Sequence, residues 1–113
     1  MDAAGYELGE AAVSARLLVS ARLREIAMRC RDADDVTVYL RRRQITGQLA
    51  DPCRCPLIVW LHQSTGLDCL RVTTDSVWIL DGDEHVASVP LPRVLRAWEL
   101  AFDHGDYPQL ITR

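Results

Sequence analysis

Residues 69–92 read CLRVTTDSVWILDGDEHVASVPLP, and they carry the clearest pattern in the sequence. Apolar and polar residues alternate in three short runs, and turn residues separate the runs at Thr74-Asp75 and Asp81-Gly82. Such alternation is typical of half-buried strands, and Asp-Gly between two runs is a strong hairpin signal. The pattern predicts an antiparallel meander of three strands, at about Cys69–Thr73, Ser76–Leu80 and Glu84–Val89.

The two turns also predict which residues face each other across the sheet. Two-residue turns place Arg71 opposite Trp78, and Trp78 opposite His85. The core face then carries Leu70, Val72, Val77, Ile79 and Val86. Arg71, Trp78 and His85 form a row on the other face, as an Arg–Trp cation–π pair or as a binding surface, since Trp and Arg are enriched in hot spots. The row is either a surface for a protein partner or internal packing under the tail around Tyr107.

The segment from Glu10 to Arg31 predicts a long first helix, because it has no Gly or Pro and is rich in Ala, Leu and Arg. Its core stripe consists of Ala12, Ala15, Val19, Leu23, Ile26 and Cys30. A second apolar group lies roughly opposite and consists of Leu17, Leu18, Ala21 and Met28. A helix that is apolar on two sides is either sandwiched in the fold or used in an interface. In so short a chain we favour self-association as a homodimer, the alternative being scattered surface apolar residues.

Two further helices are expected before the strands. The acids of Asp32-Ala33-Asp34-Asp35 suit a new helix start, because N-caps and the helix dipole favour them there. Val36–Gln44 alternates like a strand but also has one apolar helical face, and we favour helix. The third helix begins at Pro56 and ends at Gly66.

A last helix follows the strands, because Pro90-Leu91-Pro92 ends the sheet and Arg93 to about Asp103 has helical periodicity. Its predicted buried stripe consists of Val94, Trp98, Ala101 and Phe102. The tail after Gly105 is apolar enough to be docked. The chain of 113 residues is therefore expected to form one α+β domain (1–113), with three N-terminal helices, a three-stranded antiparallel meander and a C-terminal helix.

Charge and hydropathy limit the partners and the location. The formal net charge is −3, although all 13 basic residues are arginines and Arg41, Arg42 and Arg43 are adjacent. These three are candidate phosphate contacts, but the acidic balance opposes non-specific nucleic-acid binding. The sequence has neither a targeting segment nor the roughly 18 consecutive apolar residues of a membrane span. We therefore expect a cytoplasmic protein without a membrane partner.

The four cysteines do not predict a metal centre. Cys53-x-Cys55 has a single intervening residue and no second close pair, whereas structural zinc sites combine two such pairs. Cys55 is a candidate reactive thiol for a separate reason. A thiol at the start of the Pro56 helix would have its pKa lowered by the helix dipole. A reactive thiol at Cys55 is therefore one alternative function.

Two segments carry a resemblance to known proteins. They are Cys55-Pro56-Leu57 with Trp60-Leu61, and Pro90-Leu91-Pro92 followed by Phe102-Asp103-His104-Gly105-Asp106-Tyr107-Pro108-Gln109-Leu110. The chain resembles small uncharacterised proteins of actinobacteria and their phages, with a Cys-Pro-Leu helix start and a Phe-Asp-x-Gly-x-Tyr-Pro-x-Leu ending. The similarity covers about residues 45–111, and it implies an α+β domain and an origin in a high-GC bacterium or phage.

No catalytic motif such as His-Glu-x-x-His or Gly-x-Ser-x-Gly occurs in the sequence, and nothing predicts a cofactor. The leading hypothesis is therefore a non-enzymatic protein-interaction or regulatory module that forms a homodimer. A nucleic-acid-binding accessory protein that uses its Arg-rich helix is the first alternative, and a redox switch at Cys55 is the second.

Overall fold

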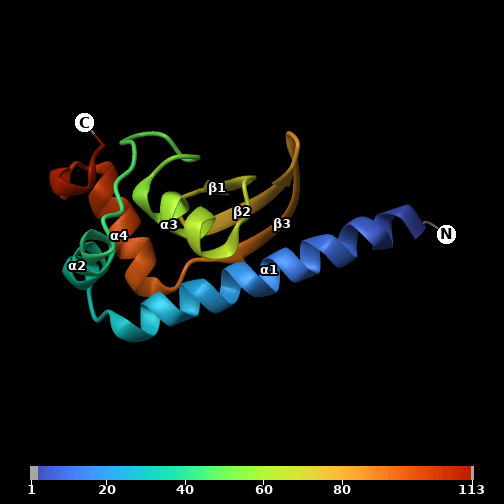
Figure 1. Cartoon of the computed structure of the whole chain (residues 1–113), viewed down its shortest axis with the longest axis horizontal. Helices are drawn as coiled ribbons and strands as arrows, with labels where there is room; N and C mark the ends of the chain where they lie inside the picture. Colours follow the sequence, from blue (N-terminus) through green and yellow to red (C-terminus); the bar gives the residue numbers. More distant parts are fainter. Residues whose placement is uncertain (1–2, 113) are drawn as a thin grey trace.

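The computed structural model describes the backbone of residues 3–112 and the side chains of residues 11–112. The elements follow in the order α1 (Ala3–Arg29), α2 (Ala33–Arg42), α3 (Pro56–Thr65), β1 (Leu70–Val72), β2 (Ser76–Asp81), β3 (Glu84–Pro90), α4 (Arg93–Asp103) and the 3₁₀ turn η1 (Pro108–Leu110) (Figure 1). The α+β class and the three-stranded antiparallel sheet are confirmed. Within the described residues, no helix combines the length and the hydropathy needed to span a bilayer.

The long helix α1 packs against β3 and α3 and extends past the sheet towards the N-terminus (Figure 1). It begins earlier than the sequence predicts and ends at Arg29 instead of Arg31. The expected core stripe is confirmed at its centre, because Val19, Leu23 and Ile26 are buried. α1 therefore supports the sheet with one side and leaves the other side free.

The ambiguous segment Val36–Gln44 is helical as far as Arg42, where α2 ends. The Asp32 side chain caps α2 by accepting a hydrogen bond of 2.9 Å from the Asp35 amide. Val36, Tyr39 and Leu40 are buried, which is the spacing of a single helix face. α2 packs against α4 and η1 at the end of the molecule opposite the N-terminus (Figure 1).

The sheet register is confirmed between β1 and β2, where Arg71 pairs with Trp78. Between β2 and β3 the predicted register is wrong, since Trp78 pairs with Ser88 and His85 pairs with Leu80. The hairpin turn falls on Gly82-Asp83, with Gly82 at φ 65°, and a β-bulge follows at Ile79/Leu80. The glycine takes the left-handed position that the turn requires, and the bulge adds one residue to β3.

The bulge leaves the predicted core face almost intact. Leu70, Val72, Val77, Ile79 and Val89 are buried, and Val86 is half-buried against the core. α1 and α3 pack against strands of this sheet, which separates a buried inner face from an outer face.

The C-terminal tail is docked against the loop after α2. The Gly47 amide donates to the Leu110 carbonyl at 2.9 Å, and the Thr112 amide donates to the Gly47 carbonyl at 2.8 Å. The Tyr107 hydroxyl donates to Asp34 Oδ1 at 2.8 Å. The alternative in which the tail around Tyr107 covers the outer sheet face is therefore wrong.

Candidate functional site

The outer sheet face brings together the three residues expected there. Arg71 and His85 are exposed and Trp78 is half-buried. The Trp78 and His85 rings stack with centroids 4.1 Å apart and an interplanar angle of 8°, although the two residues are not register partners. The predicted contact is thus made diagonally across the bulge. Among the described residues the cation–π contact involves Arg43 over Tyr39, at 3.5 Å from the ring centroid, and not Arg71 with Trp78.

The second apolar group of α1 faces solvent. Leu17 is 66% exposed and Met28 is 80% exposed, Ala21 is also exposed, and Leu18 is half-buried. Val13, which the sequence analysis missed, is exposed on the same side. We call Val13, Leu17, Ala21 and Met28 the outer α1 stripe.

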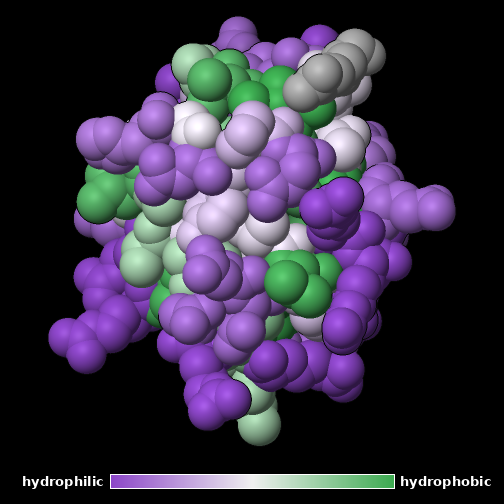
Figure 2. Space-filling view, turned by 90° about the vertical axis from the view of Figure 1, so that its left-hand side faces the viewer, coloured by the Kyte–Doolittle hydropathy of each residue, from purple (hydrophilic) through white to green (hydrophobic). Residues whose placement is uncertain are grey.

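Arg41, Arg42 and Arg43 are exposed around the end of α2. Figure 2 shows the end of the molecule on which α2 and the C-terminal segment lie, where hydrophilic residues predominate and apolar ones form isolated patches. Arg42 and Arg43 line a pocket there, whereas Arg41 is not among its lining residues.

The Cys55 thiol differs from its expected state. Cys55 is the N-cap of α3, as the sequence predicts, but its side chain is buried. Burial, and next the nearby Glu99 carboxylate, raise the pKa of the thiol well above its usual value, and the amides of Ile58 and Leu57 only partly oppose them. The predicted lowering of the Cys55 pKa is therefore wrong, because desolvation outweighs the helix dipole. The protonated thiol donates a hydrogen bond to Glu99 Oε1 at 3.7 Å.

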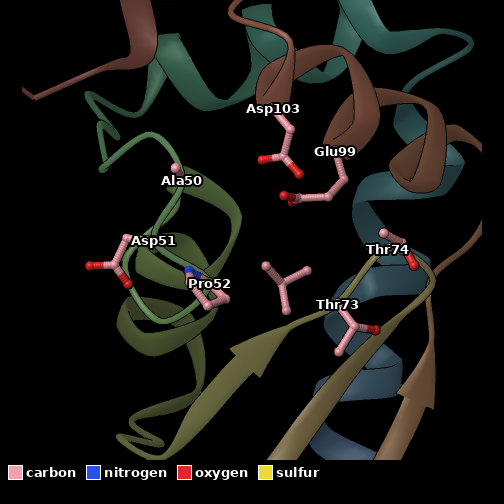
Figure 3. Close-up of a pocket in the computed structure, with 8 residues that line it drawn as sticks. Ala50, Asp51, Pro52, Thr73, Thr74, Glu99 and Asp103 are labelled. Atoms are coloured by element: carbon pink, nitrogen blue, oxygen red, sulfur yellow. The ribbon is translucent and has the colours of Figure 1, made fainter.

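Glu99 is a buried carboxyl group that the sequence analysis did not identify. It is 3% exposed, and burial together with the Asp103 carboxylate raises its pKa from 4.5 to about 7. Figure 3 shows Glu99 and Asp103 reaching from α4 towards the space between the Ala50–Pro52 loop and the Thr73-Thr74 turn. These residues line a pocket of about 310 Å³. The pocket wall can therefore hold or release a proton near neutral pH.

The sequence contained a signal for this burial. Leu95, Trp98, Glu99 and Phe102 are the buried residues of α4, with the spacing i, i+3, i+4 and i+7. The predicted stripe was right at Trp98 and Phe102, whereas Val94 and Ala101 are only partly buried. The predicted stripe was displaced around the helix from the observed one, and it therefore left out Glu99, which belongs to the buried face.

Metal-binding residues are not gathered in the part of the chain that the structure describes, where no group of three or more His, Cys, Asp or Glu side chains could hold an ion. Cys30, Cys53, Cys55 and Cys69 are all free thiols. His62 Nδ1 lies 2.9 Å from the Leu67 carbonyl oxygen and 3.2 Å from Asp68 Oδ1, so local contacts engage this ring.

Comparison with protein-family models, with curated proteins and with solved structures finds no match to this chain. The resemblance to actinobacterial and phage proteins stays a prediction.

Proposed function

We propose that this protein is a non-enzymatic interaction module that works as a homodimer, with the outer α1 stripe as the dimer interface. The observation that carries the proposal is the exposure of Leu17 and Met28 on the side of α1 that faces away from the core. Large apolar side chains aligned on one helix face lose unfavourable contact with water when a second helix covers them.

A second copy of the same helix fits the spacing of the stripe. Val13 and Ala21 lie four residues before and four residues after Leu17, so they flank it on the same helix face. In an antiparallel pair centred on Leu17, the larger Val13 of one protomer would meet the small Ala21 of its partner. A two-fold interface of this kind uses the same patch twice and needs no second partner surface.

The outer sheet face is the second surface of the proposal, and its occupant would be an acidic segment of another protein. It presents the Arg71 cation, the His85 ring and the half-buried Trp78. The half-buried Ser76, Leu80 and Ser88 beside them are uncharged. The exposed carboxylates of Asp81 and Glu84 lie at the hairpin end next to His85, so the positive charge of this face is at Arg71. A half-buried aromatic anchor beside the Arg71 cation can bind a partner segment that carries carboxylates.

Light scattering of the wild type and of Leu17→Glu tests the dimer. At about 50 µM, a working concentration for micromolar affinities, we expect a mass of about 25 kDa for the wild type, twice the chain mass of 12.7 kDa. Leu17→Glu should be monomeric, because it places a charge at the centre of the interface. Leu100→Glu is the matched control, since Leu100 on α4 is 60% exposed but lies outside the stripe. A monomeric wild type, or equal effects of both substitutions, would exclude the α1 interface.

A further inference from the structure

Four arginines from the ends of two helices meet at one concave site. Arg29 ends α1, Arg31 lies in the following link, and Arg42 and Arg43 are at the end of α2. They line a pocket of about 420 Å³ together with Asp35, Val38 and Tyr39. We call this site the arginine pocket.

The arginines of the pocket are not held in ion pairs with carboxylates of the described residues. In the part of the chain whose side chains are described, the ion pairs are Arg22–Glu25 and His62–Asp68, and neither involves a pocket arginine. Asp35 is the acid that lines the pocket, and it accepts a hydrogen bond of 2.8 Å from the Arg31 backbone amide. Four guanidinium groups thus face one carboxylate, in a protein whose net charge is −3.

The local backbone and Tyr39 explain how this cluster is held. The carboxyl ends of α1 and α2 carry the negative ends of their helix dipoles, which stabilise the arginine cations there and oppose a bound anion, so the four guanidinium groups must supply the binding energy. The Arg43 guanidinium lies over the Tyr39 ring, and its Nη1 donates to the Tyr39 carbonyl at 3.1 Å. Tyr39 is in turn fixed by an edge contact with Trp60, with ring centroids 5.8 Å apart. Arg43 is therefore held in place before any ligand arrives.

The chemistry of the lining favours phosphate groups. Arginine presents a planar fork of N–H donors that matches phosphate oxygens in pairs, and four arginines can engage more than one phosphate. The volume falls within the range of small-molecule sites. Tyr39 is only 9% exposed, so its ring has no open face on which a ligand could stack. Val38, which is 45% exposed, is the apolar side chain of the lining that a ligand can contact.

A compact ligand fits better than a nucleic-acid strand. The exposed acids Asp32 and Asp34 lie next to the site in the sequence, and the whole chain is acidic. A long polyanion would extend from the pocket across these repelling charges. We propose that the arginine pocket binds a compact polyphosphate, either a free inorganic chain or the polyphosphate tail of a nucleotide.

Calorimetric titration with inorganic triphosphate tests the site, with Arg31→Gln/Arg42→Gln as the pocket variant. The matched control is Arg54→Gln/Arg96→Gln, which removes two exposed arginines outside the pocket. We expect one saturable site per chain, weakened by about tenfold or more in the pocket variant and by less than about twofold in the control. The substituted side chains are exposed, and unchanged thermal melts of the free variants will verify their folding; the single Arg42→Gln serves if the double variant does not fold.

Two further titrations identify the ligand source. Equal affinities for ATP and triphosphate would indicate recognition of phosphate alone, and tighter binding of ATP would assign the site to a nucleotide tail. Absence of saturation up to about 1 mM, or equal losses in the pocket variant and its control, would overturn the proposal. Tighter binding of duplex DNA than of triphosphate at the same salt concentration would also overturn it, in favour of a nucleic-acid site.

Discussion

Replacing Glu99 with glutamine should remove a specific part of the pH dependence of stability. Burial raises the pKa of Glu99 from 4.5 to about 7. The folded protein therefore binds this proton more tightly than the unfolded chain does. The resulting stability is fully present below about pH 4.5 and is lost as the pH rises through about 7.

The expected magnitude follows from the shift of the pKa. At 1.36 kcal/mol per pKa unit, a shift from 4.5 to about 7 is linked to a total of about 3 kcal/mol. About 2 kcal/mol of this should be lost between about pH 5.5 and pH 8. A glutamine side chain has nearly the shape of a protonated glutamate, can accept the Cys55 hydrogen bond and cannot ionise. Glu99→Gln should therefore lose about 2 kcal/mol less than the wild type over that interval.

Urea unfolding at the two pH values measures this difference. All residues other than residue 99 are common to both proteins, so the difference between them isolates Glu99. Glu84→Gln, which changes an exposed acid on β3, should follow the wild type. A stability difference between wild type and Glu99→Gln that is the same at both pH values would refute the linkage argued from burial.

Three further substitutions test the packing. Gly47→Ala should destabilise the protein by about 3 kcal/mol in a urea melt, because a Cβ atom there would collide with the backbone of Arg54, Cys55 and Pro56; a near-neutral effect would contradict this close approach. Trp78→Ala should change the free energy of unfolding by no more than about 1 kcal/mol, whereas Ile79→Ala on the inner face should cost about 2–5 kcal/mol. Equal costs at these two positions would mean that Trp78 belongs to the core.

Local patterns account for the parts of the fold that could be predicted. The N-caps at Asp32 and Cys55 depend on neighbouring residues, and so does the β1–β2 register. The inner stripe of α1 follows from helical periodicity alone. Each of these features depends on residues that are close together in the sequence, which is why the sequence alone could predict it.

The remaining features depend on contacts that sequence spacing does not contain. Aspartate and glycine signalled the hairpin correctly, but its central residues are Gly82-Asp83 instead of Asp81-Gly82, and the bulge at Ile79/Leu80 that accompanies this turn is not visible in the spacing. Burial of the Cys55 thiol, and next the carboxylate of Glu99 44 residues away, reverse the direction of its predicted pKa shift. The run Arg41–Arg43 was visible in the sequence, whereas the meeting of Arg42 and Arg43 with Arg29 and Arg31 is a product of tertiary structure.

The docking of α2 against the C-terminal part of the chain has a consequence for folding during synthesis. Thr37 accepts a hydrogen bond from Trp98, 61 residues later, and Asp34 accepts one from Tyr107, 73 residues later. The hairpins of the sheet close short loops and can form early, whereas α2 must wait for α4. Until α4 leaves the ribosome, the part of α2 that packs against α4 lacks its native partner, although Tyr39 can already contact Trp60 of α3. This interval is when a nascent chain would be most exposed to aggregation and to capture by chaperones.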